Sequence, residues 1–508
     1  MSTPERPKVV IIGAGAAGVF TGFQLQKYAP DKFDITIFDK NDAVGGNARG
    51  HDGEWQGQKV HIDCGAQFFY ETTEPTYCDM LRDEGFFDEA GLIVESAVGM
   101  SVWNATEKHI EFAVADNILG ILEAVAKHPG DWVHFLEFTV AAIDKFFSDD
   151  WTETFGDWLE GIWLSGDTDA KTKFKNKIVR PLMYQFGLMP PGELDKLSAL
   201  GVVYFFVGSL PWPEHKQPPQ GQEPKTAPFH LYTSNIGLDG IQKRLLTKYG
   251  LTAQLNTTIA SISPQAQGGG WIVTAQDGTQ TLADELVFAT NPHATMAMLP
   301  NDSAFAELRD LLSGMPYQSV DIHVQQSPSS PYVSPDKDDW TVANVAFVED
   351  TNGNTSDYML SIWFGPLKGK PGDDFWKSWG SPNLEPGNQP PPWVLQTHQE
   401  VVYIPDYVVR RDKLGSSEYQ GVNSLWYAGG YIIDYDTQDS CLKSGRIIAE
   451  RLLKQYGLPE PVIPPTKPPI DPQHPPRLLV DIEKVLRTLG FSHPVVDEFK
   501  QRPSLTGA

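Results

Sequence analysis

The first forty residues contain two short apolar runs separated by a longer segment of mixed polarity. Lys8–Ile12 reads K-V-V-I-I, and such a β-branched run is typical of a buried parallel strand. A second run, Asp34–Phe38, reads D-I-T-I-F. The segment between them predicts a helix from Ala16 to Tyr28. The pattern therefore predicts a β-α-β unit with two parallel strands.

Glycines occupy the turn between the first strand and this helix. Gly13, Gly15 and Gly18 have the spacing G-x-G-x-x-G. The first glycine permits the tight turn, the second lets the backbone approach a pyrophosphate, and the third lets the helix pack closely. The helix N-terminus then offers N–H groups to phosphate. Asp39 ends the second strand, where an acid binds a ribose hydroxyl and repels a 2′-phosphate. Because all these elements occur in order, a dinucleotide site is favoured over an ordinary glycine-rich turn.

The rest of the chain alternates between helical and strand-like patterns. Residues 117–200 carry apolar positions at helical spacing. Residues 251–290 read as strands broken by glycine turns and close with the apolar run E-L-V-F-A-T. Residues 301–419 mix strands with a Pro/Gly-rich insertion at 371–393, and residues 425–452 read as strand, glycine turn and helix.

Two proline-rich segments interrupt these patterns. Residues 211–228 predict a long loop, either a surface excursion or a lid. Residues 458–476 predict an extended linker. A helix with one apolar face is expected after it, formed by Leu478, Leu479, Ile482, Val485, Leu486 and Leu489. We expect this face to pack on its own domain, with a homodimer contact or a membrane surface as alternatives. Asp481 and Glu483 on the polar side disfavour a membrane.

Composition narrows the class of protein. The chain has 508 residues, too many for one simple core. Its net charge of −25 disfavours a nucleic-acid partner and an anionic membrane. Cys64, Cys78 and Cys441 have neither metal-binding nor disulfide spacing, which predicts no metal site and fits a reducing compartment. Because no secretory signal or spanning apolar run is evident, we expect a cytoplasmic protein. The expected partner is a small-molecule substrate.

Further glycine motifs point to a particular dinucleotide. Gly45 and Gly46 follow Asp39, and residues 61–69 read H-I-D-C-G-A-Q-F-F. These motifs resemble the flavin-containing amine oxidase and phytoene desaturase superfamily, in which the Gly-Gly pair lies along the pyrophosphate and the second segment lies near the flavin. The resemblance implies FAD rather than NAD. Non-covalent FAD is expected, with a covalent link at Cys441 as the alternative.

The resemblance extends over roughly residues 8–455. Residues 251–290 are similar to the superfamily's strand meander, whose equivalent of Ile259 supplies backbone contacts to adenine. Residues 425–452 contain L-W-Y-A-G-G-Y and resemble the last FAD motif, in which a helix points at the flavin pyrimidine. P-H-A-T-M-A-M-L and Y-M-L-S-I-W-F are similar to elements of a subgroup of predicted NAD/FAD-binding oxidoreductases. That subgroup implies a fold more than a reaction.

Two positions depart from the superfamily pattern. Asn47 stands where members usually have Arg, so Lys40 or Arg49 is expected to neutralise phosphate charge instead. Gly430 stands where many members have an acid that binds the ribitol. A backbone contact or Asp434 is expected to replace that acid.

Together the patterns predict an α/β protein with a Rossmann-type FAD-binding domain and an interleaved α+β substrate domain, as in amine oxidases. The expected division is FAD-binding domain 6–100, 235–300 and 420–456; substrate domain 101–234 and 301–419; and linker with C-terminal helix 457–508. The residues assigned to FAD binding are Gly13, Ala14, Gly15, Ala17, Gly18, Asp39, Lys40, Gly45, Gly46, Asn47, Gly65, Ala66, Gln67, Phe68, Ile259, Ala289, Gly429, Gly430, Asp439, Ser440, Cys441 and Leu442.

A flavin transfers hydride or electrons itself, so the protein needs no obvious acid–base pair. Tyr70, Tyr232, His323 and Trp363 are the candidate catalytic residues, each with a purely structural role as its alternative. The expected activity is FAD-dependent removal of hydride from a C–N or C–C bond of a small apolar or aromatic substrate. A redox-neutral double-bond isomerase and a non-catalytic flavin-binding protein are the alternatives. A second G-x-G-x-x-G after a strand is missing, which disfavours an NAD(P)H site.

Overall fold

The structure is a computed structural model that describes residues 6–55, 58–187, 191–210, 220, 230–266, 269–327, 329–351, 353–368, 375–380, 394–459 and 476–490. Apart from Gln220, the predicted 211–228 loop lies outside these residues, as does most of the proline-rich linker. The chain divides into two compact units. Unit 1 contains Met1–Gln67, Ile236–Gln318 and Asp406–Thr466, and unit 2 contains Phe68–Asn235, Ser319–Pro405 and Lys467–Ala508.

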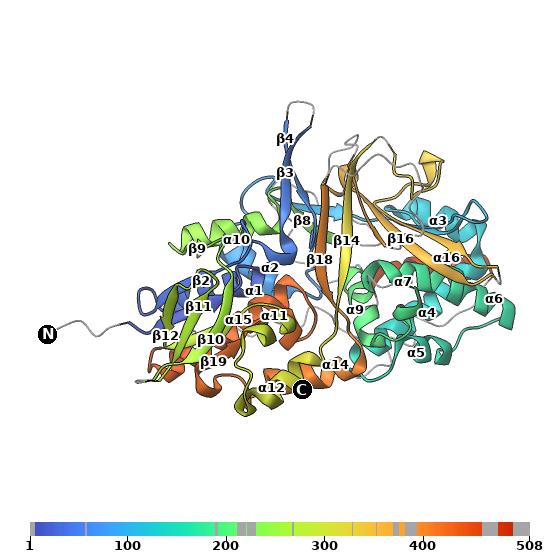
Figure 1. The fold of residues 1–508 in the computed structure, drawn as a ribbon. Helices are drawn as coiled ribbons and strands as arrows, with labels where there is room; N and C mark the ends of the chain where they lie inside the picture. Colours follow the sequence, from blue (N-terminus) through green and yellow to red (C-terminus); the bar gives the residue numbers. More distant parts are fainter. Residues whose placement is uncertain are drawn as a thin grey trace. The chain divides into compact units, whose positions relative to one another are not determined.

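Unit 1 is built on a five-stranded parallel sheet (Figure 1). Its order is β19 (Leu425–Tyr427), β13 (Glu285–Phe288), β1 (Lys8–Ile12), β2 (Asp34–Phe38) and β9 (Ala253–Gln254). β1 lies in the middle, and its apolar residues from Val9 to Ile12 are buried. The predicted β-α-β unit is therefore present with the bounds expected from the sequence.

Three helices of unit 1 pack together beside this sheet. α1 (Ala16–Tyr28) contacts both α10 (Gly237–Lys248) and α15 (Gln438–Gln455). α15 approaches α1 very closely, because a β-carbon on Gly445 would lie 2.7 Å from the backbone nitrogen of Thr21. The remaining elements of unit 1 are η1 (Gly46–Ala48), β3 (Gly50–Trp55), β4 (Gln58–Asp63), β10 (Ile259–Pro264), β11 (Trp271–Ala275), β12 (Gln280–Ala283), α11 (Pro292–Met298), η3 (Ser303–Phe305), α12 (Ala306–Ser313), α14 (Pro405–Gly415), η6 (Val422–Ser424) and η7 (Gly430–Ile432).

Unit 2 is built on a seven-stranded mixed sheet. Its order is β18 (Val394–Val401), β14 (Tyr317–Gln326), β17 (Phe375–Gly380), β16 (Thr355–Trp363), β15 (Ala343–Glu349), β6 (Met100–Asn104) and β7 (His109–Val114). A separate two-stranded sheet pairs β5 (Ile93–Ala97) with β8 (His230–Ser234). β17 lies inside the segment that the sequence predicts to be a Pro/Gly-rich insertion, so that prediction is wrong for residues 375–380. The side chains of F-W-K-S-W are buried on both faces of the sheet. This burial stabilises a strand here although prolines and glycines surround it.

The helical prediction for residues 117–200 is confirmed. These residues form α3 (Ile118–Lys127), α4 (Pro129–Phe147), α5 (Phe155–Gly161), α6 (Thr168–Lys173), η2 (Phe174–Val179), α7 (Arg180–Gly187), α8 (Pro191–Leu194) and the start of α9 (Ala199–Ser209). Short polar side chains mark several of the starts. Asn117, for example, accepts a hydrogen bond from the Gly120 backbone N–H at 3.0 Å. Unit 2 also contains α2 (Pro75–Asp83), η4 (Lys337–Asp339), α13 (Phe364–Leu367) and α16 (Arg477–Thr488).

The two units divide the chain at different places from the expected domains. Residues 68–100 belong to unit 2, because β5 pairs with β8 and β6 pairs with β15. Residues 301–318 and 406–419 belong to unit 1, where Arg410 on α14 donates to the Asp310 carbonyl on α12 at 3.0 Å. These boundaries depend on pairings between distant segments, which local sequence patterns do not contain.

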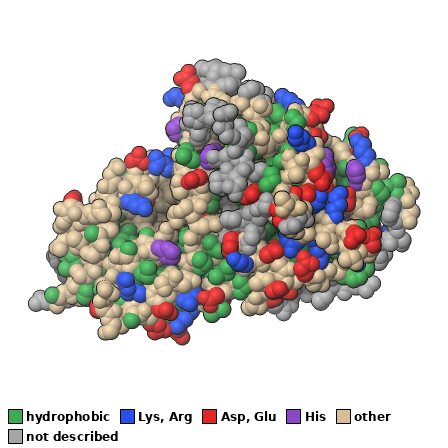
Figure 2. All heavy atoms as spheres, turned by 45° about the vertical axis from the view of Figure 1, so that its right-hand side comes forward, with side chains coloured by type: hydrophobic (Ala, Val, Ile, Leu, Met, Phe, Trp, Pro, Cys, Tyr) green, Lys and Arg blue, Asp and Glu red, His purple; other side chains and the backbone are tan. Residues whose placement is uncertain are grey.

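Charged side chains of both signs are interleaved on the face of the molecule that Figure 2 shows, with no uniformly basic region on it. Several of the charges pair within unit 2, such as Lys177 with Glu349 at 2.7 Å and Arg180 with Asp195 at 3.0 Å. Of the helices that the structure describes, none has the length and apolar character needed to cross a membrane.

The C-terminal helix α16 packs on α3 and α4 of unit 2 (Figure 1). Leu479, Ile482 and Leu486 on its apolar face are fully buried, whereas Val480 on the opposite side is 38% exposed. The expected packing of this helix on its own unit is therefore observed.

We predict that Leu486→Ala lowers the free energy of unfolding by about 2–5 kcal/mol, because it empties a buried leucine site. Val480→Ala on the same helix should change it by less than about 0.5 kcal/mol. Urea titration followed by circular dichroism measures both values. Equal effects of the two substitutions would show that α3 and α4 do not cover this helix in solution.

His398 on β18 is buried in unit 2 with an exposed fraction of 2%. Neither ring nitrogen has a hydrogen-bond partner in the part of the chain that the structure describes. Burial, together with the positive charge of Lys377, lowers the pKa of His398 to about 4. The folded protein therefore keeps this imidazole neutral at a pH where the unfolded chain, with an ordinary histidine pKa of about 6.5, protonates it.

The sign of the resulting pH dependence follows from proton counting. Between pH 6.5 and 4 the unfolded state binds the extra proton, so acidification lowers stability by up to about 3 kcal/mol, at about 1.4 kcal/mol per pKa unit. His398→Phe should remove this part of the acid sensitivity, measured as the slope of unfolding free energy against pH. His51→Phe, at an exposed position, is the control. An unchanged slope in His398→Phe would contradict the prediction.

Candidate dinucleotide-binding site and an adjoining histidine–aspartate cluster

The turn between β1 and α1 is shaped by two glycines that no other residue can replace without movement. Gly13 has a φ of +113°, and a β-carbon there would lie 2.4 Å from the carbonyl oxygen of Ala289. A β-carbon on Gly18 would lie 1.9 Å from the carbonyl oxygen of Gly13. Because no side chain caps α1, its first-turn N–H groups are presented at this turn. This is the geometry that binds a pyrophosphate in dinucleotide-binding proteins.

Asp39 lies at the end of β2 and faces the same turn. Its two carboxylate oxygens accept hydrogen bonds from the backbone N–H groups of Ala14, at 2.7 Å, and Asn41, at 2.8 Å. Each carboxylate oxygen has a further lone pair, which leaves capacity for a ribose hydroxyl. The aspartate therefore holds the turn and remains able to bind a sugar.

Gly45 and Gly46 lie directly against this turn. The Gly45 N–H donates to the Ala14 carbonyl at 3.0 Å, and Gly15 forms a parallel bridge with Gly45. A β-carbon on Gly46 would lie 3.0 Å from the α-carbon of Gly15. The two glycine segments thus form one surface made of backbone, which suits a phosphate group that needs close approach.

The segment at residues 63–67 is tied to the second glycine segment. The Ala66 N–H donates to the Asn47 carbonyl at 2.9 Å. Gly65, Ala66 and Gln67 are therefore held beside Asn47 within unit 1, whereas Phe68 belongs to unit 2. Of the two cations proposed to replace the missing arginine, Lys40 is exposed and Arg49 pairs with Asp42 at 3.0 Å.

The last predicted motif also lies in unit 1. α15 begins after Thr437, whose side-chain oxygen accepts from the Ser440 N–H at 3.1 Å, and its first turn contains Asp439, Ser440 and Cys441. Gly429 donates its N–H to the Ser444 hydroxyl at 3.0 Å.

The structure explains why residue 430 is a glycine and not an acid. A β-carbon there would lie 2.6 Å from the α-carbon of Asp436 and 2.9 Å from its carboxylate oxygen Oδ1. The Asp436 carboxyl thus occupies the space next to position 430, and burial raises its pKa to about 6. Asp434, the acid expected from the sequence, lies 3.9 Å from Lys443 instead.

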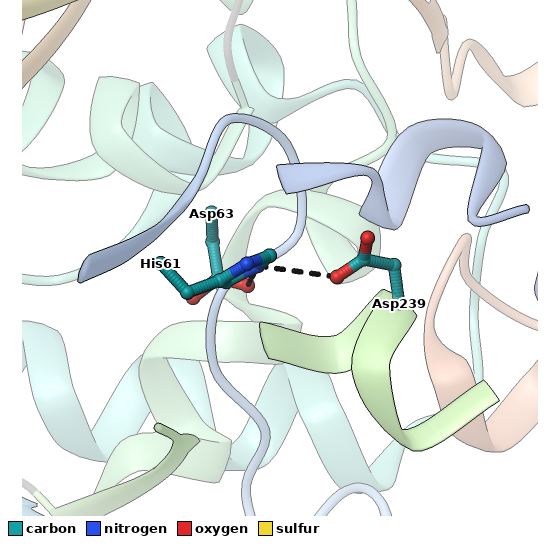
Figure 3. Close-up of side chains that lie close together, drawn as sticks. All are labelled: His61, Asp63 and Asp239. Carbon is teal, nitrogen blue, oxygen red and sulfur yellow. Dashed lines mark ion pairs between the residues drawn. The ribbon is translucent and has the colours of Figure 1, made fainter. Parts of the chain in front are cut away.

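A histidine–aspartate cluster adjoins these segments, and the sequence reading missed it. His61 and Asp63 come from β4 and Asp239 from the first turn of α10, as Figure 3 shows. The His61 Nε2 atom lies 3.1 Å from Asp239 Oδ1 and 3.8 Å from Asp63 Oδ1, and Nδ1 lies 2.7 Å from Asp52 Oδ1. The alternation of His61 and Asp63 along one strand was the only local signal.

Burial opposes the charged form of His61, but the hydrogen bond to Asp239 and the charges of Asp63 and Asp52 outweigh it, so its pKa is raised. Burial alone would raise the pKa of Asp239. The hydrogen bonds and positive charges of His61 and Lys243 outweigh this effect and lower the pKa.

The four candidate catalytic residues all lie in unit 2. Tyr70 and Tyr232 lie near Phe69, which pairs with Tyr232 through a β-bridge. The Tyr232 hydroxyl donates to Glu71 at 3.3 Å. Burial raises the pKa of both tyrosine hydroxyls, so neither is an easily ionised acid.

His323 and Trp363 share one face of the seven-stranded sheet. His323 pairs with Ser378 and Trp363 pairs with Trp376, two residues apart on β17 between them. Trp363 stacks on Trp376 with ring centroids 5.6 Å apart, and Trp340 packs edge-on against both. The register brings His323 and Trp363 to the same side of the sheet, beside a cluster of three tryptophans.

Comparisons with known proteins agree with this geometry. A family model described as "NAD(P)-binding Rossmann-like domain" matches residues 11–83. No curated protein shows significant sequence similarity. Solved structures with a similar fold include a protein from Exiguobacterium sp. 255-15 to which protoporphyrinogen oxidase activity is provisionally ascribed, with 13% identity, coverage of 89% of this chain and 99% of that chain, and a TM-score of 0.56.

Two further structures have the same fold. A CLA-producing fatty acid isomerase from P. acnes has 14% identity, coverage of 90% and 100%, and a TM-score of 0.54. A putrescine oxidase variant redesigned in its cofactor binding has 13% identity, coverage of 89% and 99%, and a TM-score of 0.52. At these identities the likeness establishes the fold alone. The chain has an amine-oxidase-like α/β fold with a Rossmann-type domain, which confirms the fold class expected from the sequence.

We predict that Gly18→Ala destabilises the protein by about 3 kcal/mol, because the new methyl group meets backbone that cannot yield. Gly22→Ala on the same helix is the matched control. Its β-carbon would meet the side-chain ends of Ile37, at 3.2 Å, Leu251, at 3.4 Å, and Ile11, at 3.7 Å. The helix propensity of alanine should offset that contact within about 1 kcal/mol. Chemical unfolding of both variants tests the difference, and equal stabilities would contradict the close approach.

Proposed function

We propose that the protein is an FAD-dependent oxidoreductase that takes hydride from a C–N or C–C bond of a small organic substrate. The observation that carries this proposal is the backbone surface formed by Gly15, Gly45 and Gly46, with Asp39 beside it. A Rossmann turn alone would suit any dinucleotide. The second glycine segment and its link to residues 63–67 favour FAD, as the superfamily resemblance implies.

The residues of unit 1 have separate tasks in this proposal. The first turn of α1 and Gly15 bind the pyrophosphate, and Asp39 binds the adenosine ribose. The first turn of α15 stabilises negative charge on the reduced cofactor. FAD, when bound, supplies the hydride or electron transfer, so the protein has to orient the substrate and exclude competing reactions.

The proposed substrate is apolar or aromatic. Support comes from the tryptophan cluster of unit 2, where Trp363 is only half-buried while Trp376 is fully buried. Aromatic side chains of this kind commonly line sites for apolar ligands. His323, half-buried on the same face of the sheet, is the polar group proposed to orient the substrate or move a proton.

A second candidate function is redox-neutral isomerisation of a double bond. The fatty acid isomerase among the structures of similar fold favours it. For such a reaction the bound FAD would supply reversible hydride transfer with no net oxidation of the substrate, so no external electron acceptor would be consumed.

We further propose that the protein is cytoplasmic, acts on a small-molecule substrate and forms a homodimer. Cys64, Cys78 and Cys441 are buried and form no disulfide, which suits a reducing compartment. Size-exclusion chromatography of the purified chain would decide the oligomeric state.

We predict that the purified protein carries one FAD per chain and that Asp39→Ala weakens FAD binding about 10- to 100-fold. A lost hydrogen bond to a charged group is worth about 1.5–3 kcal/mol. Asp34→Ala, at an exposed position on the same strand, should leave binding unchanged. Fluorescence titration of the apoprotein with FAD measures both, and circular dichroism checks the fold. Equal affinity of the two variants for FAD would contradict the role assigned to Asp39.

The reaction itself is tested by mixing the anaerobic holoprotein with a panel of amines, unsaturated lipids and aromatic compounds. An oxidase bleaches with its substrate and recovers colour in air. Product formation without oxygen consumption would select the isomerase instead. If no compound bleaches the flavin and none is converted, the result would support a non-catalytic flavoprotein.

A further inference from the structure

We propose that His61, Asp63 and Asp239 form a binding site for a divalent transition-metal cation, with zinc as the ion that fits the donor set best. Each residue offers one ligand atom, and these atoms all lie within 4.8 Å of one another. Imidazole nitrogen and carboxylate oxygen are common zinc ligands. The site lies wholly within unit 1.

The separations between the ligand atoms match a tetrahedral ion. Zinc binds nitrogen and oxygen at about 2.0–2.2 Å, which puts neighbouring ligands about 3.3 Å apart. The observed separations from His61 Nε2 are 3.1 Å to Asp239 Oδ1 and 3.8 Å to Asp63 Oδ1. Three protein ligands leave the fourth position of a tetrahedron for water.

Two of the ligand atoms have no described hydrogen-bond partner other than each other. His61 Nε2 and Asp239 Oδ1 are buried and face each other at 3.1 Å, and neither makes a hydrogen bond with any other described residue. The side chains are 10% and 1% exposed. A hydrogen bond between them requires a protonated His61, because a neutral imidazole that donates through Nδ1 presents only a lone pair at Nε2. A single cation between them would satisfy both.

The other ring nitrogen of His61 is held as in known metal sites. Nδ1 lies 2.7 Å from the carboxylate of Asp52. Histidines that bind a metal through one nitrogen usually donate the other N–H to a carboxylate, which orients the ring and raises its basicity. Asp52 is thus the positioning residue that turns Nε2 toward Asp63 and Asp239.

The charges of the cluster also balance with a dication. Asp52, Asp63 and Asp239 carry three negative charges, and Lys243 supplies one positive charge 2.7 Å from the other oxygen of Asp239. A dication with a neutral His61 brings the sum to zero. A protonated His61, the competing arrangement, leaves one negative charge in the cluster.

Two glycine backbones pack closely against Nε2. A β-carbon on Gly50 or on Gly237 would lie 2.2 or 2.0 Å from this atom, so neither position has room for a side chain. Larger residues at either position would therefore fill the space beside the ligand atom.

The cation would join the β3–β4 hairpin to α10 and support the proposed cofactor surface. A β-carbon on Gly45 would lie 2.9 Å from the β-carbon of Asp239, so the Gly45 backbone rests on the proposed ligand. Its role is structural, since it fixes the glycine segment from behind.

A second group of possible ligands provides an internal control. Glu107, His109 and Glu111 lie in unit 2, and Lys173 and Lys177 pair with these acids. His109 is 42% exposed. This group is more exposed and is already neutralised by lysines, so it carries no proposal.

The test measures zinc directly in the full-length holoprotein. Protein treated with a chelator and then dialysed is titrated with zinc chloride by calorimetry, and its zinc content is measured after gel filtration. One zinc per chain is expected in the parent protein and in His109→Gln. His61→Gln and Asp239→Asn should weaken binding at least tenfold. Asp52→Ala, at an exposed position that should not disturb folding, should weaken it about 10- to 100-fold.

Zinc should also raise the temperature of thermal unfolding of the parent protein and not that of His61→Gln. The proposal is overturned if zinc binds His61→Gln and the parent equally, if His109→Gln abolishes binding, or if the parent binds no zinc. FAD content is measured on every sample. Measuring zinc and FAD on the same samples distinguishes a failure of this site from a failure of the proposed cofactor function.

Discussion

The close approach of α1 to the turn after β1 is the constraint on which unit 1 depends. Gly18 has no room for a side chain against the Gly13 carbonyl, and Gly445 has none against the Thr21 backbone. These contacts bring the backbone of α1 onto the turn and the backbone of α15 onto α1. Because glycine alone allows such distances, the first turns of both helices are held where the sheet ends, and the proposed FAD site is built around them.

Buried polar groups hold the rest of this unit in register. Glu285 on β13 accepts hydrogen bonds from the Trp426 indole at 2.8 Å and from the Tyr456 hydroxyl at 2.9 Å. It thus joins β19 and the end of α15 to the central sheet. The cluster around His61 joins the β3–β4 hairpin to α10 in a similar way. It differs because His61 Nε2 and Asp239 Oδ1 are buried with only each other as described hydrogen-bond partners, among three carboxylates whose charge a cation would balance.

Much of the fold was predictable because its signals are local. The β-α-β unit, the helical region from residue 117 to 200 and the start of α15 each follow from periodicity and capping within a few residues. The strand at residues 375–380 was missed because prolines and glycines surround it. The unit boundaries differ from those expected because they depend on which strands pair across the chain.

The sequence by itself determined the dinucleotide motif, because Gly13, Gly15, Gly18 and Asp39 act through backbone geometry close to them in the chain. Only the tertiary structure decided what surrounds that motif. It put Asp239 against His61, across a long stretch of intervening chain, and it folded the turn after Gly430 so that Asp436 fills the space beside that glycine. Contacts of this kind arise from how the chain returns to the same place, and no local spacing of residues records that path.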